Sequence, residues 1–330
     1  MVEKIRWGLL STANINRRVI PAIRMSARGE LTAVASRSQA KSDAYAAQWE
    51  IPQAFGSYEA MLESDAVDAV YIGLPNRLHA EWSIKAMRAG KHVLCEKPFA
   101  LTLAEVDEMT AVSQQTGMKL AEAFMYRHHP QTKIVGEWVR NGRLGDIVLV
   151  RSHFSFKLEN LANVRMIPEL GGGSLWDVGV YPLSLAQFVM GGAPQQVWGR
   201  QWVGASSGVD ESFAGQMDYG NGRVAQISSG FRTPFHTWAE IIGTNGRLTL
   251  NRPFIGLDER RQLLFYHPDD TIEEVRVPQQ ELYLGEIEDM HAAIFDDQPN
   301  YLTLAETRNH IRTVLALYES AQTGRVVHLA

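Results

Sequence analysis

The sequence predicts an α/β protein in two parts, a parallel α/β part over residues 1–123 and an α/β part with an open, mostly antiparallel sheet over residues 124–330. The chain of 330 residues is too long for one ordinary core and suits two domains. Up to residue 122, short apolar runs alternate with helical patterns, which is typical of βαβ units. After about residue 150, strand patterns follow one another directly.

The first part is predicted from alternating strands and helices. Strands are expected at 5–10, 30–36, 67–73, 91–95 and 118–123. Helices are expected at 15–25 and at 58–62, the latter after an N-cap at Ser57. A helix that follows the second strand is expected to end at Trp49, and one that follows the third strand is expected to end near Ala89, before Gly90. The last helix of this part is expected to begin at a Thr102/Glu105 capping box and to stop at Gly117. Unbroken apolar strands separated by helices indicate a parallel sheet that is buried on both faces.

The second part is predicted to be rich in antiparallel strands. These are expected at 147–156, 195–203, 210–219, 223–232, 238–243 and 247–251, with a helical tail over 285–322. Turn signals stand at 220–222 (Gly-Asn-Gly) and 244–246 (Thr-Asn-Gly). Such short connections favour antiparallel neighbours.

Composition excludes several classes of protein. The net charge of −5 and the absence of a dense Lys/Arg run argue against binding to nucleic acid. No stretch approaches 18 apolar residues, so we expect no membrane span, and Cys95 alone permits no intramolecular disulfide. The first residues lack the pattern of a secretory leader, so we expect a cytoplasmic protein. The ten histidines are scattered, and we expect no metal site.

The turn after the first strand is a candidate phosphate-binding loop. In parallel α/β sheets a dinucleotide binds where a strand leads into a helix N-terminus, because free N–H groups and the helix dipole favour phosphate. The stretch Ser11-Thr12-Ala13-Asn14-Ile15-Asn16 occupies this place and carries small residues instead of the G-x-G-x-x-G glycines. An ordinary strand-to-helix turn would also explain these residues, so the loop alone does not decide between a cofactor-binding loop and a plain turn.

The end of the second strand carries Ser36 and Arg37, with Lys41 one helical turn further on. An acidic residue here would accept from the ribose 2′-hydroxyl of NAD. A guanidinium instead suits charge-assisted bonds to a 2′-phosphate. The sequence therefore favours NADP, with NAD as the alternative.

Two further motifs carry candidate catalytic groups. Glu96-Lys97-Pro98 follows a parallel strand, so Lys97 is expected at the ligand-binding edge of the sheet, and Pro98 restricts its backbone and is open to a cis bond. The run from Gly171-Gly172-Gly173 to Tyr181 contains Asp177, which on a helix shares a face with Tyr181 four residues later. A surface lysine and a buried helical tyrosine are the ordinary explanations when each motif is taken alone.

Taken together, these motifs resemble the Gfo/Idh/MocA oxidoreductases along essentially the whole chain. The resemblance rests on Gly8 with its Ser-Thr-Ala loop, Ser36-Arg37, Pro75-Asn76-Arg77-Leu78-His79, Glu96-Lys97-Pro98, Arg127 with Pro130, and the Gly-Gly-Gly…Asp-x-Gly-x-Tyr run. The most specific pieces are the Glu-Lys-Pro motif and the Asp-x-Gly-x-Tyr motif about 80 residues later.

The resemblance implies a Rossmann domain, an α/β substrate and oligomerisation domain, and hydride transfer between NAD(P) and a sugar or related alcohol. It assigns catalysis to Lys97, Tyr181 and Asp177: Tyr181 as the acid/base, Lys97 as its helper and Asp177 as a ligand of substrate hydroxyls. Cofactor contacts are implied for the loop residues Ser11, Thr12, Ala13, Asn14 and Ile15, for Ser36, Arg37 and Lys41, and for Leu74, Pro75, Asn76, His79, Glu96 and Lys97. For His79, a helix-capping role is the alternative.

Tyr181 departs from the histidine of inositol dehydrogenase-like members. A tyrosine there is similar to the dihydrodiol dehydrogenase and NADP-linked D-xylose dehydrogenase branch. A free phenol has a pKa of about 10, and a nearby ammonium such as that of Lys97 favours the phenolate. The substrate pocket is predicted to include Arg127, Phe154 and Trp176, although core packing explains the two rings equally well.

Two other functions fit the same motifs. A nucleotide-sugar ketoreductase would need cationic groups for the diphosphate, for which Arg127, Arg165 and Arg232 are available. A non-catalytic cofactor-binding sensor would be expected to lose the lysine or the acid, and both are retained here. Because a sheet with an apolar outer face usually needs a partner, we also predict a homodimer or tetramer.

Overall fold

The computed structural model describes residues 3–255 and 258–329, and these form two compact units. Unit 1 comprises 1–128 and 281–307, and unit 2 comprises 129–280 and 308–330. The sequence placed the boundary at 123/124 and assigned the whole tail to the second part. The structure instead groups 281–307 with the first sheet, because helix α8 (Leu284–Phe295) packs on helix α1 (Asn16–Met25).

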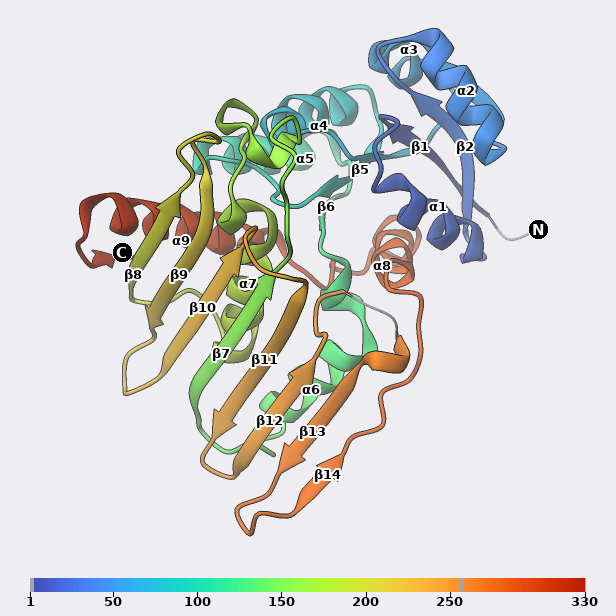
Figure 1. Ribbon diagram of the computed structural model, residues 1–330. Helices are drawn as coiled ribbons and strands as arrows, with labels where there is room; N and C mark the ends of the chain where they lie inside the picture. Colours follow the sequence, from blue (N-terminus) through green and yellow to red (C-terminus); the bar gives the residue numbers. More distant parts are fainter. Residues whose placement is uncertain (1–2, 256–257, 330) are drawn as a thin grey trace. The chain divides into compact units, whose positions relative to one another are not determined.

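Unit 1 is built on a six-stranded sheet in the order β3-β2-β1-β4-β5-β6, in which every strand pair is parallel (Figure 1). The strands are β1 (Ile5–Leu10), β2 (Gly29–Ala35), β3 (Gln53–Phe55), β4 (Ala69–Ile72), β5 (His92–Glu96) and β6 (Leu120–Ala123). This is the doubly wound order that binds dinucleotides at the carboxyl ends of the strands. The predicted fold class is confirmed here, and only the short strand β3 was missed.

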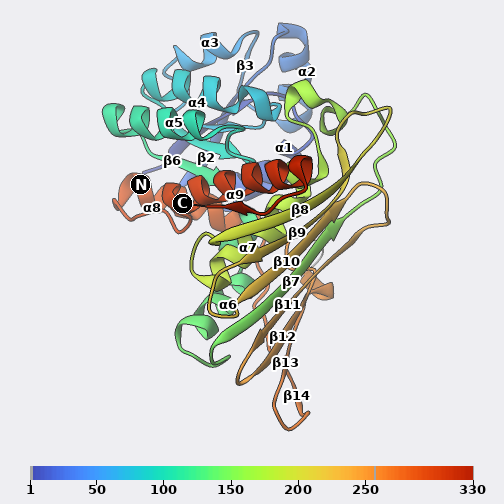
Figure 2. The same ribbon diagram turned by 90° about the vertical axis from the view of Figure 1, so that its left-hand side faces the viewer.

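The helices of unit 1 cover both faces of this sheet (Figure 2). Besides α1 and α8 they are α2 (Gln39–Trp49), α3 (Tyr58–Leu62), α4 (His79–Arg88) and α5 (Leu103–Thr116), with 3-10 turns η1 (Asn76–Leu78) and η2 (Met125–His128). The predicted caps are confirmed: Ser57 accepts from the Ala60 N–H, and Thr102 and Glu105 form a reciprocal capping box. Gly117 ends α5 with a φ of 72°.

Unit 2 is built on a nine-stranded sheet in the order β14-β13-β12-β11-β7-β10-β9-β8-β15. The strands are β7 (Ile147–Ser155), β8 (Gln196–Val203), β9 (Asp210–Asp218), β10 (Val224–Gly230), β11 (His236–Gly243), β12 (Gly246–Asn251), β13 (Gln262–Tyr266), β14 (Ile272–Glu274) and β15 (Val327–His328). The mostly antiparallel prediction is confirmed, with one parallel pair, β7–β10. Strands β13, β14 and β15 were missed because they lie in or after segments without a tight turn signal.

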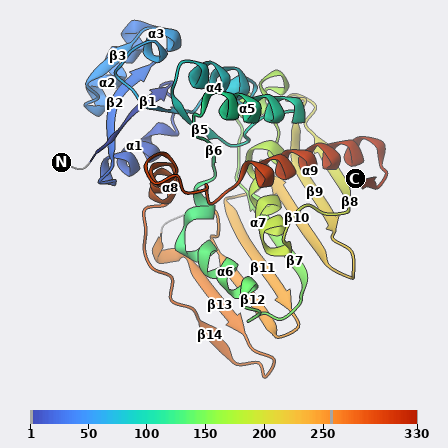
Figure 3. The same ribbon diagram turned by 180° about the vertical axis from the view of Figure 1, so that it is seen from behind.

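The two faces of the nine-stranded sheet differ. Helices α6 (Pro130–Arg140) and α7 (Val180–Met190) lie on one face, as does the unit 2 part of α9 (Leu304–Thr323) (Figure 3). On the opposite face Trp198 and Trp202 of β8 are 44% and 46% exposed, and Ile272 of β14 is 59% exposed. Residue Glu240 on this face accepts from Arg151 and Arg247. The exposed apolar side chains thus lie on strands near the two ends of the sheet, with the ion pairs of Glu240 between them, and the oligomer stays a prediction.

Candidate active site

The loop after β1 is held in a tight turn by Ser11. Its φ of 133° lies in the region that favours glycine, at a cost of order 1–3 kcal/mol. The Ser11 hydroxyl donates to the Gly73 carbonyl (3.1 Å) and accepts from the Ala13 N–H (3.2 Å). The loop leads directly into α1, whose first turn contains no acidic residue. This geometry suits an anion at the helix N-terminus.

A second loop, after β4, packs against the first one. A Cβ on Gly73 would lie 3.1 Å from the Ile15 side chain, so the two loops touch at this glycine. The predicted residues Leu74, Pro75 and Asn76 follow at once and lead through η1 into α4. The structure thus brings together the predicted cofactor residues of the β1 and β4 ends within unit 1.

The end of β2 places the predicted 2′-phosphate residues on the surface. Ser36 is buried, and its hydroxyl donates to the Ser38 carbonyl (2.8 Å) and accepts from the Ser42 hydroxyl (3.0 Å). Arg37 and Lys41 are exposed at this same end of the strand. The buried serine shapes the turn, while the exposed cations remain accessible to an anionic group.

The Glu96-Lys97-Pro98 segment stands at the carboxyl end of β5, as predicted, and the Lys97–Pro98 bond is cis. The backbone N–H of Lys97 donates to its neighbour Glu96 (Oε2, 3.1 Å). The other oxygen of Glu96 accepts from the hydroxyl of Tyr71, a fully buried residue of β4. The side chain of Lys97 is partly exposed, at the sheet edge that carries the two loops.

Two buried polar side chains hold the segment from the other side. His79 lies with Nδ1 2.8 Å from the Pro98 carbonyl and Nε2 2.8 Å from the Leu74 carbonyl. Burial lowers the pKa of His79, and a neutral ring donates from only one nitrogen. Glu122 on β6 accepts from the Phe99 N–H (3.3 Å) and from the Thr307 hydroxyl (2.8 Å). The ring of His79 therefore lies between the second loop and the Glu-Lys-Pro segment and, when neutral, donates to one of the two carbonyls.

In unit 2, the glycine run is anchored by an aspartate that sequence reasoning missed. Asp210, the first residue of β9, accepts from the Ser174 hydroxyl (2.8 Å), the Leu175 N–H (2.8 Å) and the Tyr318 hydroxyl (2.7 Å). Gly173 has a φ of 123°, and a Cβ there would lie 2.2 Å from Asp210. Burial raises the pKa of Asp210 to about 6, against the three hydrogen bonds that lower it.

The anchored segment is a π-helical turn, η5 (Leu175–Gly179), that runs into α7. The sequence predicted an ordinary helical relation between Asp177 and Tyr181. The structure places Asp177 within a π turn and Tyr181 in the α-helix that follows it; π turns are frequent at functional sites, and no residue pattern signals this one. Asp177 is buried and accepts from the Nε of Arg165 (2.7 Å).

Tyr181, in the first turn of α7, is surrounded by aromatic rings. Its ring centroid lies 5.4 Å from that of Phe154 on β7 and 5.5 Å from that of Phe254, and the Phe154 and Phe254 rings stack at 5.9 Å. Tyr181 is only 5% exposed. Phe154, which the sequence assigned to the substrate pocket, is therefore a neighbour of Tyr181. Phe254 was missed, because nothing in its Pro-Phe context indicates proximity to α7.

The other predicted substrate residues are tightly packed within their units. Arg127, on η2, is 1% exposed and donates to Glu306 (2.9 Å). Trp176, on the π turn, is buried with its ring 5.8 Å from that of Tyr318. The contacts described for Arg127 and Trp176 are with other residues of the protein, and their contacts with a substrate stay predictions.

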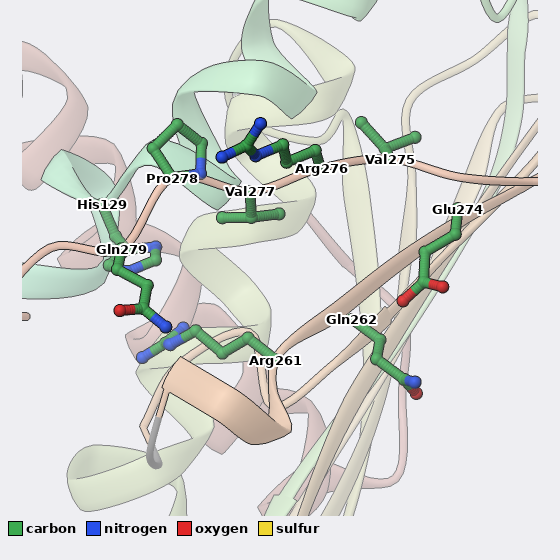
Figure 4. Close-up of a pocket in the computed structure, with 9 residues that line it drawn as sticks. All are labelled: His129, Arg261, Gln262, Glu274, Val275, Arg276, Val277, Pro278 and Gln279. Atoms are coloured by element: carbon green, nitrogen blue, oxygen red, sulfur yellow. The ribbon is translucent and has the colours of Figure 1, made fainter.

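Unit 2 also contains a cavity of about 390 Å³ that is separate from these residues (Figure 4). Figure 4 shows Arg261 extending toward His129 and Gln279, with Glu274 on the other side. Neither Asp177 nor Tyr181 lines it. Elsewhere, within 3–255 and 258–329, no three His, Cys, Asp or Glu side chains gather as metal ligands. No helix in the described part of the chain is long and apolar enough to cross a membrane.

Comparison with known proteins covers both units. The model of the oxidoreductase family with an NAD-binding Rossmann fold, GFO/IDH/MocA, matches residues 5–124. The model of the GFO/IDH/MocA C-terminal domain matches residues 133–249.

Among curated proteins, a D-xylose 1-dehydrogenase (NADP(+)) of Haloferax volcanii is 38% identical over 98% of this chain and 99% of its own length. A dTDP-3,4-didehydro-2,6-dideoxy-α-D-glucose 3-reductase of Streptomyces violaceoruber is 35% identical over 83% of this chain and 81% of its own.

Among solved structures, a 3-ketoreductase of Actinomadura kijaniata in complex with NADP and TDP-benzene has a TM-score of 0.89 at 29% identity. The alignment covers 96% of this chain and 98% of the ketoreductase. An aldose-aldose oxidoreductase of Caulobacter crescentus, complexed with glycerol, has a TM-score of 0.92 over 99% of this chain and all (100%) of its own. At 24% identity the latter likeness supports the fold alone.

Proposed function

Because the chain belongs to the GFO/IDH/MocA oxidoreductase family, we propose that it transfers hydride between NADP and a hydroxyl or carbonyl carbon of a sugar or cyclic diol. The observation that carries this proposal is the presence of Lys97 at the carboxyl end of β5, pinned through its own backbone at the edge where dinucleotides bind. The relative from Haloferax volcanii, named for xylose and NADP, supports both parts of the proposal.

The cofactor site is proposed at the ends of β1, β2, β4 and β5. Ser11, in its glycine-like conformation, and the N-terminus of α1 suit the pyrophosphate, and the second loop suits the nicotinamide half. Arg37 and Lys41 are accessible to a 2′-phosphate. These residues fit NADP, whose nicotinamide ring would accept or donate the hydride when the cofactor is bound.

The proton is proposed to move at the hydroxyl of Tyr181. In the oxidative direction this oxygen removes the proton of a substrate hydroxyl, and in the reductive direction it protonates the carbonyl oxygen. The ammonium of Lys97 favours the phenolate and polarises the carbonyl. Asp177, which the Arg165 guanidinium orients, is proposed to accept from a second substrate hydroxyl.

The nucleotide-sugar alternative is favoured by the 35% identical reductase of Streptomyces violaceoruber. It needs cations for a diphosphate, and the three candidates have partners inside the protein. Arg127 pairs with Glu306, and Arg165 pairs with Asp177. The third, Arg232, stacks on Trp202, 3.9 Å from its ring centroid. Because the relative with 38% identity is named for D-xylose, free sugars and diols are the preferred substrate class.

The test is reduced-nicotinamide absorbance with NADP or NAD against pyranoses, cyclic diols and nucleotide-linked hexoses. We expect NADP-linked turnover of a free sugar or diol. Turnover of nucleotide-linked sugars alone would favour the nucleotide-sugar ketoreductase. Tight NADPH binding without turnover of any of these compounds would favour a non-catalytic cofactor-binding sensor.

The cofactor preference is tested separately by Arg37→Ala. Loss of charge-assisted bonds to a phosphate, about 1.5–3 kcal/mol, should raise KM for NADP by about 10–100-fold and leave KM for NAD nearly unchanged. Arg88→Ala is the control, since Arg88 is an exposed arginine on α4 of the same unit. An equal rise in KM for NADP and for NAD would contradict the proposed contact between Arg37 and the 2′-phosphate.

Assembly as a homodimer or tetramer is proposed to use the outer face of the nine-stranded sheet, supported by its exposed Trp198, Trp202 and Ile272. A purified chain that scatters light as a monomer would contradict it. A cytoplasmic location likewise stays a prediction.

A further inference from the structure

Asn16 is a buried amide at the end of the loop after β1, and the proposed cofactor site gives it no role. It is the first residue of α1 and is 1% exposed. Its Nδ2 donates to the carbonyl of Ser11 over 2.7 Å. An asparagine at a helix start commonly caps the helix, by accepting from the free N–H groups there. The Asn16 side chain instead reaches back to the residue that follows β1.

The direction of this hydrogen bond is set by its acceptor. A carbonyl oxygen can only accept, so the Asn16 amide must turn its nitrogen toward Ser11, since its oxygen would be repelled at 2.7 Å. The N-cap residue of α1 is Ile15, whose side chain makes no capping bond. The N–H groups at this helix end therefore receive no cap from either residue, which suits the binding of an anion there.

The backbone of Ser11 needs contacts that fix it. Its φ of 133° is one that glycine adopts readily and that a residue with a Cβ adopts only at a cost in free energy. The Ser11 hydroxyl donates to the Gly73 carbonyl and accepts from the Ala13 N–H, while the Ser11 carbonyl accepts from Asn16. The hydroxyl contacts belong to the serine side chain. The contact from Asn16 acts on the backbone itself, so it bears directly on the conformation of the loop.

The bond from Asn16 also sets the direction of the next peptide group. The Ser11–Thr12 bond is trans, since the one cis bond among the described residues is Lys97–Pro98. In a trans peptide the C=O and the N–H point in opposite directions. Because the Ser11 carbonyl is turned toward Asn16, the Thr12 N–H points away from it. A pyrophosphate oxygen needs N–H donors of fixed direction in this loop.

Space for the Asn16 amide comes from the loop after β4. A Cβ on Gly73 would lie 3.3 Å from the Oδ1 of Asn16 and 3.1 Å from the Ile15 side chain. A larger residue at position 73 would therefore press on the amide, because such contacts are shorter than ordinary packing distances. Gly73 also accepts from the Ser11 hydroxyl (3.1 Å). Ser11, Asn16 and Gly73 thus pack together where the ends of β1 and β4 meet.

We propose that Asn16 is a positioning residue: by donating to the Ser11 carbonyl it keeps Ser11 in its glycine-like conformation, so that the loop retains the shape that receives the cofactor diphosphate. Its contact lets a serine stand where a dinucleotide-binding loop commonly has its first glycine. The part of this inference that concerns the cofactor rests on the proposed function. The part that concerns the Ser11 backbone does not, and it can be tested without a ligand.

The first test measures NADPH binding by titration calorimetry in a double-mutant cycle of Asn16→Ala and Ser11→Gly. Without Asn16 the serine relaxes, and binding must restore the strained loop, so Asn16→Ala should raise the Kd about tenfold or more. Glycine adopts this φ unaided, so the same change made together with Ser11→Gly should raise the Kd about threefold or less. Equal losses with and without Ser11→Gly would overturn the proposal, because Asn16 would then act independently of the Ser11 conformation.

Two further variants separate the hydrogen bond from packing. Asn16→Leu keeps most of the side-chain volume and lacks the donor, so it should weaken NADPH binding as Asn16→Ala does. A loss with alanine but not with leucine would assign Asn16 a packing role and contradict the proposal. Thr32→Val is the matched control, because the buried Thr32 of β2 also donates to backbone carbonyls of unit 1, those of Trp7 (3.2 Å) and Ala66 (2.7 Å). It should change the Kd by about twofold or less, since it leaves the loop untouched. A loss as large as that of Asn16→Ala would count against a specific role of Asn16.

The second test is a crystal structure of the Asn16→Leu variant without cofactor. We expect Ser11 to leave the positive-φ region and its carbonyl to turn away from residue 16. A Ser11 that keeps a φ near 133° in this variant would overturn the proposal, since its own hydroxyl contacts would then suffice. This result does not depend on a ligand. A wild-type chain that fails to bind NADPH would contradict the proposed function, while the Ser11 backbone of the variant would still decide the role of Asn16.

Discussion

The segment around Lys97 and the segment around Tyr181 are held by different forces. Lys97 stands on a short loop whose backbone N–H groups donate to Glu96 and Glu122 and whose Pro98 carbonyl lies against the ring of His79. Tyr181 stands on a helix and is enclosed by the rings of Phe154 and Phe254. The proposed helper cation thus depends on directional polar contacts, and the proposed acid/base depends on shape. A polar deletion should therefore affect the first and a change of volume the second.

The largest effect is expected from Phe254→Ala. The side chain is fully buried (0% exposed) and contacts both Phe154 and Tyr181, so its removal should cost about 3–5 kcal/mol of unfolding free energy. Urea unfolding measures the loss. Phe235→Ala is the control: its ring also contacts Phe154, at 6.1 Å, but is 44% exposed and should cost much less. Equal costs would mean that the rings around Tyr181 are loosely packed.

An intermediate effect is expected from Asp210→Asn, which tests whether unit 2 has a polar anchor of its own. An amide presents two N–H groups where Asp210 now receives donors, so we expect a loss of about 1–3 kcal/mol near neutral pH.

The same variant has a pH signature. Because the folded pKa of Asp210 is raised to about 6, its protonated form favours folding. Wild-type stability from this group is complete below about pH 4 and falls as pH rises through 6, while the variant lacks this fall. Unfolding from pH 4 to 7 checks it. Parallel curves would indicate that Asp210 keeps an ordinary pKa.

The smallest effect is expected at His79. His79→Phe removes the one ring N–H that bonds either the Pro98 or the Leu74 carbonyl and should cost about 1–2 kcal/mol. NADPH affinity should fall as well, since the ring is buried between the two proposed cofactor loops. His79→Gln, which keeps a donor, should lose less of both. If the phenylalanine variant matches the wild type in stability and affinity, the tie is not needed.

Much of unit 1 could be predicted because its signals are local. A capping serine at 57, the Thr102/Glu105 box and Gly117 mark helix ends through bonds within one turn. Strand β1 was predicted at its observed bounds because Ile5–Leu10 is apolar except for Arg6 and leads into a helical pattern.

The rest depends on contacts between residues far apart in sequence. Phe254 meets Tyr181, Asp210 meets Ser174, and Tyr71 meets Glu96, each through the fold and not through spacing. The π turn before α7 and the edge strands β13 to β15 have no pattern that separates them from a loop or an α-helix. The sequence motifs therefore predicted the candidate catalytic residues, whereas the residues that contact and position them were identified only from the structure.

The central claim is that Lys97 and Tyr181 serve one chemical step. It is tested most directly by the rates of Lys97→Ala, Tyr181→Phe and the double variant on the substrate found in the panel, with folding checked by urea unfolding. Each single change should lower kcat/KM by about 10²–10⁴-fold. We predict that the double variant loses about as much as the worse single variant, because groups that act as a unit are strongly non-additive. Losses that multiply, or a single variant with wild-type turnover, would contradict the account.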